Sequence, residues 1–129
     1  MKNNEDLDEM EVDPPVVNRI AAIVKVKQPY IDWANRLPDN SGMIVSAKEL
    51  NQSPTAFLIP SYETESSIER FLQKVKPRIF EQQLNAWCTE PAWWPKERSA
   101  LEFNKWFDIE ISEMVFDLVE NDPLAHEEY

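Results

Sequence analysis

A long amphipathic segment in the second half of the chain constrains the fold most strongly. Between Ser66 and Trp87 apolar residues recur at helical spacing, and Ser66 and Glu69 stand at the spacing of a capping box. Pro77 interrupts the segment, but the apolar face stays in phase across it, which predicts one kinked helix or two helices that meet at a tight junction. The residues of this face are Ile68, Phe71, Leu72, Val75, Ile79, Phe80, Leu84 and Trp87.

Two stretches before this segment predict β-strands. Residues 19–27 are rich in β-branched side chains and end in an alternation of valine and lysine, which is typical of a half-buried strand. Residues 55–60 form a short apolar run that Pro60 stops. Pro29 favours the first turn of a helix, and the apolar spacing after it predicts a short helix over 29–37.

Pairs of serine and glutamate at capping-box spacing predict two more short helical segments. Ser46 and Glu49 indicate one helical turn before the second strand. Ser99 and Glu102 indicate a helix over 100–106.

The segment 107–119 allows two interpretations. As a strand its apolar residues alternate, but the alternation changes parity, so a bulge is required near 112–113. As a helix it would place its carboxylates on one face, whereas its β-branched and aromatic content favours the strand. Together the elements predict an α+β domain, with a small, mainly antiparallel sheet of about three strands covered by helices on one face.

The negative charge of the chain is concentrated at its two ends. The formal net charge is −11, but residues 1–13 hold six acidic residues and residues 120–129 hold four, so residues 14–119 carry 14 acidic and 12 basic residues. This distribution predicts disordered acidic tails at 1–13 and 120–129 around a single domain at 14–119. Acidic tails repel phosphate backbones, so we expect no nucleic-acid partner.

The composition also bears on compartment and chemistry. No apolar run approaches the roughly 20 residues of a membrane helix, and no signal pattern opens the chain, so we expect a cytoplasmic protein with no membrane partner. The single cysteine, Cys88, is expected to be a small buried hydrophobic residue. The single histidine, His126, lies in the C-terminal tail, and the chain has one glycine, so neither histidine-based triads nor glycine-rich phosphate loops are expected. We therefore expect no metal and no cofactor.

Carboxylates are the remaining candidates for catalysis. Glu110 and Glu113 flank Ser112, and a bulge there would turn both toward a pocket beside Trp106, where two carboxylates can act as acid and base. The competing interpretation is that both are solvent-facing charges on an amphipathic element. Of the basic residues, Lys74, Lys76 and Arg78 surround Pro77 and with Lys25 and Lys27 form either a solvated face or a positive patch shielded by an acidic tail.

Four of the five tryptophans lie within twenty residues, at positions 87, 93, 94 and 106. Core packing accounts for most of them, but Trp93 and Trp94 are adjacent in a loop bracketed by prolines, where both rings cannot easily point inward. We predict that Trp93 or Trp94, with Tyr30 and Trp33 nearby, forms a docking patch for another protein or a peptide.

Three functions from different classes follow from these residues. The first is a non-catalytic protein-interaction module that uses the aromatic patch. The second is a small-molecule binder or sensor that uses the same aromatic pocket. The third is a carboxylate-dependent hydrolase. The sequence is also compatible with a homodimer, formed either through an exposed sheet edge or through a self-complementary tryptophan patch.

Three short motifs are similar to a family of small uncharacterised bacterial proteins. They are Lys27-Gln28-Pro29-Tyr30-Ile31-Asp32-Trp33, Trp94-Pro95 and Trp106-Phe107-Asp108-Ile109-Glu110. The resemblance covers most of residues 19–119, and it implies a bacterial intracellular origin and a shared fold. It implies no activity and no site residues.

Overall fold

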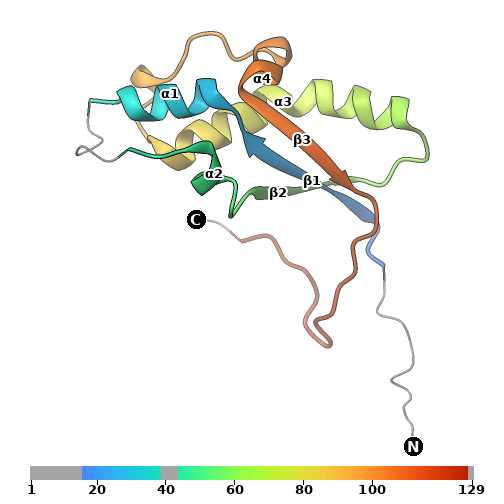
Figure 1. The fold of residues 1–129 in the computed structure, drawn as a ribbon. Helices are drawn as coiled ribbons and strands as arrows, with labels where there is room; N and C mark the ends of the chain where they lie inside the picture. The colour runs from blue at the N-terminus through green and yellow to red at the C-terminus, as the bar shows by residue number, and fades with distance from the viewer. Residues whose placement is uncertain (1–15, 39–43, 128–129) are drawn as a thin grey trace, which may run out of the picture.

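A three-stranded antiparallel sheet with helices on one side forms the body of the protein (Figure 1). The computed structural model describes residues 16–38 and 44–127. This architecture confirms the predicted α+β class. The elements in chain order are β1 (Arg19–Val26), α1 (Gln28–Arg36), α2 (Ala47–Leu50), β2 (Thr55–Pro60), α3 (Glu65–Trp87), a single 3₁₀ turn η1 (Pro91–Trp93), α4 (Ala100–Trp106) and β3 (Phe107–Ser112).

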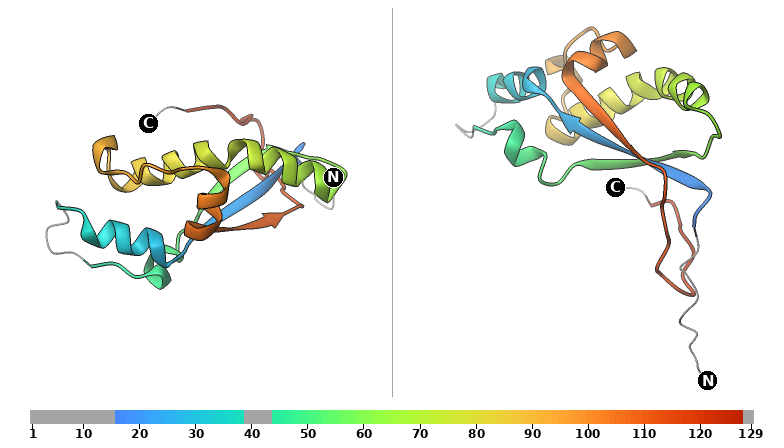
Figure 2. Two further views of the ribbon diagram at one scale, coloured as in Figure 1. Left: turned by 90° about the horizontal axis from the view of Figure 1, so that it is seen from above. Right: turned by 45° about the vertical axis from the view of Figure 1, so that its right-hand side comes forward.

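The sheet has the order β2-β1-β3, so β1 is its central strand and both of its neighbours are edge strands. Ala22 of β1 pairs with Phe57 on one side and with Ile111 on the other. Alternate residues of β1 are buried under the helices, because successive side chains point to opposite faces of a strand. Figure 2 shows that α1, α3 and α4 lie on this same side of the sheet. The buried residues of β1 are Ile20, Ala22, Val24 and Val26.

The opposite face of the sheet carries charged residues. Lys25 of β1 forms an ion pair with Glu110 of β3 at 3.2 Å, and Lys27 approaches Asp108 at 3.8 Å. The first pair follows from the register, in which Lys25 lies opposite Asp108 and therefore diagonally across from Glu110, two residues further along β3. The Lys25–Glu110 pair therefore lies on the face away from α3, whereas the ammonium group of Lys27 also donates a hydrogen bond to the carbonyl oxygen of Asn104 in α4.

Helix α3 covers the buried face of the sheet and begins earlier than predicted. Its N-cap is Thr64, whose hydroxyl accepts a hydrogen bond from the backbone N–H of Ser67, so the prediction of a cap at Ser66 is wrong. Thr64 and Ser66 both have a hydroxyl suited to capping, but Thr64 is the residue with an extended backbone directly before the helix. The helix continues through Pro77 without a break. The buried residues Ile79, Phe80 and Leu84 after the proline keep this part of the helix on the core.

The other predicted helix starts agree with the structure. Ser46 and Glu49 form both hydrogen bonds of a capping box, and Ser99 accepts a hydrogen bond from the N–H of Glu102. Helix α1 carries Pro29 in its first turn. These local signals are confirmed.

The segment 107–119 is a strand only over its first half. β3 ends at Ser112, and beyond it the chain forms a single bridge between Phe116 and Val16. Between the pair Ala21–Ser112 and this bridge, residues 17–20 lie opposite residues 113–115, so the register shifts by one residue. The extra residue lies in the N-terminal segment, so the prediction of one strand over 107–119 with a bulge near 112–113 is wrong.

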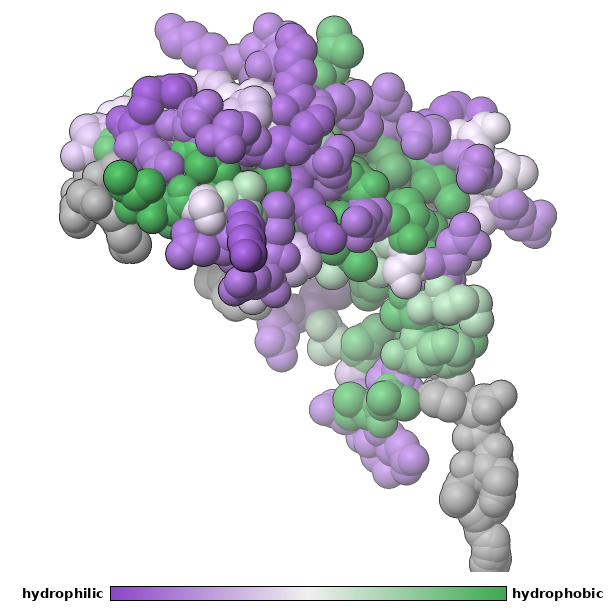
Figure 3. Space-filling view, viewed as in Figure 1, coloured by the Kyte–Doolittle hydropathy of each residue, from purple (hydrophilic) through white to green (hydrophobic). Residues whose placement is uncertain are grey.

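Residues 113–127 leave the sheet, extend below it and then turn back toward it (Figures 1 and 3). Met114, Phe116 and Leu118 are exposed in this segment, because no helix covers them. The strand ends where the helical layer ends. The boundary of a C-terminal tail at residue 120 stays a prediction, and the N-terminal tail at 1–13 lies outside the described residues.

Candidate functional site

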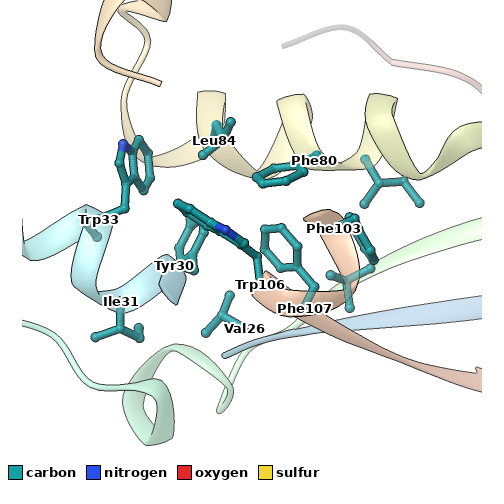
Figure 4. Close-up of a cluster of buried hydrophobic side chains, with 12 residues drawn as sticks. Val26, Tyr30, Ile31, Trp33, Phe80, Leu84, Phe103, Trp106 and Phe107 are labelled. Atoms are coloured by element: carbon teal, nitrogen blue, oxygen red, sulfur yellow. The ribbon is translucent and has the colours of Figure 1, made fainter. Parts of the chain in front are cut away.

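The aromatic residues form the core between α1, α3, α4 and the start of β3. Figure 4 shows Phe80 and Leu84 of α3 facing Trp106 and Phe107. The ring centroids of Phe80 lie 5.3 Å from Trp106 and 5.2 Å from Phe107, at the separations of favourable tilted and edge contacts. Trp106 and Phe107 thus fulfil the core role that the sequence allowed for them.

Tyr30 and Trp33 lie in this core, so they do not form part of the exposed surface. They are 4% and 6% exposed, and their ring centroids are 5.3 Å apart. The hydroxyl of Tyr30 donates a hydrogen bond to the carbonyl oxygen of Gln83 at 2.7 Å. Burial disfavours the tyrosinate and raises the pKa of Tyr30 well above its usual value.

Trp33 links this core to the loop between α3 and α4. Its indole N–H donates a hydrogen bond to the carbonyl oxygen of Trp93 at 2.8 Å. Within the loop, the indole N–H of Trp94 donates to the carbonyl oxygen of Cys88 at 2.8 Å. Of the four residues predicted for the docking patch, Trp33 therefore contacts the loop that carries Trp93 and Trp94, and Tyr30 contacts only Trp33 among them.

Arg98 connects helix α3 to the loop between α3 and α4. Its guanidinium forms an ion pair with Glu81 of α3 at 3.2 Å and donates a hydrogen bond to the carbonyl oxygen of Pro95 at 2.6 Å. The same group lies 5.7 Å from the centre of the Trp94 ring, within the range of a cation–π contact. No local sequence pattern predicts the pair of Glu81 and Arg98, because one residue lies in a helix and the other in a loop seventeen positions later.

Trp93 is the exposed member of the group. It remains 43% exposed, whereas Trp87 and Trp94 are half-buried. Its backbone is fixed on both sides, since Trp33 donates to its carbonyl oxygen and its N–H donates to the carbonyl oxygen of Glu90. We call residues 88–99 the tryptophan loop. Its anchored backbone presents one large, partly apolar ring to solvent.

The two candidate catalytic carboxylates do not face the aromatic core. Glu110 lies opposite Ile23 on the sheet face away from the helices, and its carboxylate pairs with Lys25. Glu113 follows the end of β3 and is exposed. The arrangement that the hydrolase hypothesis requires, two carboxylates beside Trp106, is absent from the described geometry of these residues.

The basic residues do not gather into one patch. Lys74 and Arg78 are exposed on α3, and Lys25 lies on the far face of the sheet, whereas Lys27 donates a hydrogen bond to the carbonyl oxygen of Asn104 in α4. Lys76 is only 9% exposed. Its ammonium group donates a hydrogen bond to Oδ1 of Asn104 at 2.8 Å and lies 5.7 Å from the centre of the Phe103 ring.

Lys76 lines a cavity of about 210 Å³ between α3, α4 and β3. The wall combines apolar side chains with a few polar ones. Its residues are Glu69, Leu72, Lys76, Phe103, Asn104, Phe107, Asp108, Ile109 and Ile111. No sequence pattern pointed to this cavity, since it depends on three elements that meet only in the folded chain.

Across 16–38 and 44–127, no helix has the length and apolar character needed to cross a membrane. Within the same ranges, no group of three or more histidine, cysteine or acidic residues could hold a metal ion. His126 is exposed, and Cys88 is half-buried against the core.

Comparisons with protein-family models, with curated proteins and with solved structures gave no match. The similarity of residues 19–119 to small bacterial proteins therefore stays a prediction.

Proposed function

We propose that this protein is a non-catalytic module that binds another protein or a peptide through the tryptophan loop, with Trp93 as the central contact. The observation that supports this proposal is an exposed tryptophan ring on an anchored backbone. Tryptophan is enriched among the residues that dominate binding energy, where truncation of one ring costs about 2 kcal/mol or more.

The anchoring of the loop favours binding because it lowers the entropic cost of association. Ordering a mobile side chain or loop at an interface costs about 0.5–1.5 kcal/mol for each rotamer-rich side chain. Here the hydrogen bonds from Trp33 and Trp94 and the contacts of Arg98 hold the loop in the free protein. A partner would therefore meet a surface that is already ordered.

The experiment that tests this proposal compares partner retention by the wild type and by Trp93→Ala. A photo-crosslinking residue at position 93 then identifies the proteins that contact the loop directly. Leu101→Ala is the matched control, because Leu101 is also an exposed apolar residue and lies on α4, outside the loop. We expect a protein that crosslinks at position 93, that Leu101→Ala retains and that Trp93→Ala loses. Equal retention by a correctly folded Trp93→Ala variant contradicts the proposal.

A small-molecule function is the second candidate. The cavity beside Lys76 supports it, although this cavity is not the aromatic pocket on which the sequence hypothesis rested. The cytoplasmic compartment remains a prediction from the sequence alone.

A further inference from the structure

We propose that the cavity between α3, α4 and β3 binds a small monocarboxylate with an apolar group, and that the ammonium group of Lys76 receives the carboxylate. This site is separate from the tryptophan loop, so it can be tested independently of the proposed protein interaction.

Lys76 is a buried cation whose ammonium group is incompletely paired. Lys76 is 9% exposed, and within the described chain no carboxylate lies within ion-pair distance of its ammonium group. The group has three donors, and the bond to Asn104 uses one of them. A buried charge without a counter-charge is costly, so an anion in the adjacent cavity would gain a strong charge-assisted hydrogen bond.

The charged side chains that line the cavity restrict the charge of the ligand. Glu69 and Asp108 also line the cavity, and Asp108 is already paired with Lys27. The ammonium groups of Lys76 and Lys27 then offset the two carboxylates, so a phosphate or another polyanion would bring two or more negative charges that no further cation offsets. A single negative charge next to Lys76 avoids most of the resulting repulsion.

The apolar side chains and the volume of the cavity restrict the rest of the ligand. Leu72, Phe107 and Ile109 form an apolar wall, and Figure 3 shows apolar surface over this part of α3 and β3. Pockets for drug-sized ligands have volumes of roughly 300–1,000 Å³, so a cavity of about 210 Å³ suits a smaller molecule. A branched aliphatic or small aromatic carboxylic acid meets both requirements.

The test uses 3-methylbutanoate as the probe and amide chemical shifts of the full ¹⁵N-labelled chain as the readout. We expect saturable shifts at Asn104, Asp108 and Ile109. The neutral isostere 3-methylbutanamide should bind at least about tenfold more weakly, because it cannot form the charge-assisted bond. Inorganic phosphate should give no saturable shifts at these residues.

Two lysine substitutions test whether the ammonium group of Lys76 binds the carboxylate. Lys76→Met should raise the dissociation constant of 3-methylbutanoate at least about tenfold, whereas Lys74→Met should change it by less than about twofold. Lys74 is the matched control because it lies on the same helix, carries the same charge and does not line the cavity. The comparison of acid and amide on the wild type still decides the question if Lys76→Met fails to fold.

Three results would overturn the proposal. The first is the absence of saturable shifts with 3-methylbutanoate. The second is equally tight binding of the amide or of phosphate at the same residues. The third is an equal loss of affinity in Lys74→Met and Lys76→Met.

Discussion

The buried indole of Trp33 donates a hydrogen bond to the backbone carbonyl oxygen of Trp93, sixty residues later in the chain. A core residue thereby fixes the backbone of the most exposed tryptophan. The bond explains how an aromatic cluster can serve as core and as surface: the inner rings pack, and their polar atoms hold the loop that carries the outer ring.

Replacing Trp33 with phenylalanine should loosen the tryptophan loop without emptying the core. The change keeps an aromatic ring but removes the N–H that donates to Trp93, and a partly buried carbonyl oxygen then loses its partner. We expect a loss of about 1–3 kcal/mol in the free energy of unfolding, measured by urea denaturation. Hydrogen exchange at Trp93 and Trp94 should accelerate more than exchange in β1. Unchanged exchange in the loop would show that this bond does not hold it.

The core itself should respond strongly to truncation at Phe80. This residue is 0% exposed and contacts the rings of Phe103, Trp106 and Phe107. Phe80→Ala should lower the free energy of unfolding by about 3–5 kcal/mol. Phe116→Ala removes the same atoms from a residue that is 44% exposed, and it should cost less than about 1 kcal/mol. Similar losses in both variants would place Phe116 in a packed environment.

The start of α3 can be tested by comparing two hydroxyl residues. Thr64→Ala removes the acceptor for the N–H of Ser67 and should cost about 1 kcal/mol in the free energy of unfolding. Ser66→Ala should change it by less than about 0.5 kcal/mol, because Ser66 is an exposed residue within the first turn. The reverse order of the two effects would support the cap that the sequence pattern predicted.

The differences between sequence and structure have a common physical origin. Strands, the prolines that open helices and the caps at Ser46 and Ser99 depend on neighbouring residues, so the sequence predicts them well. The end of β3 at Ser112 depends on where the helical layer stops, which no local pattern contains.

The candidate sites show the same limit. The sequence predicted an exposed ring at Trp93 or Trp94 because two prolines bracket that loop, and Trp93 is exposed. The sequence did not predict that Tyr30 and Trp33 are buried and so cannot share this surface, since burial depends on which elements pack together. The burial of Lys76 beside Asn104 depends on the contact between α3 and α4, so the basic residues around Pro77 do not predict it.

The buried hydroxyl of Tyr30 should make stability fall at alkaline pH. Its pKa is raised by burial, so the unfolded chain loses this proton near pH 10 while the folded chain keeps it. The unfolded state then binds fewer protons than the folded state, and the free energy of unfolding decreases as the pH rises above about 10. Tyr30→Phe cannot ionise, so its stability should decline less over the same range, although it loses the hydrogen bond to Gln83 at every pH. Urea denaturation of both proteins at pH 8, 10 and 11 measures this difference. Parallel curves would show that the hydroxyl ionises equally well in both states, which would contradict its burial against α3.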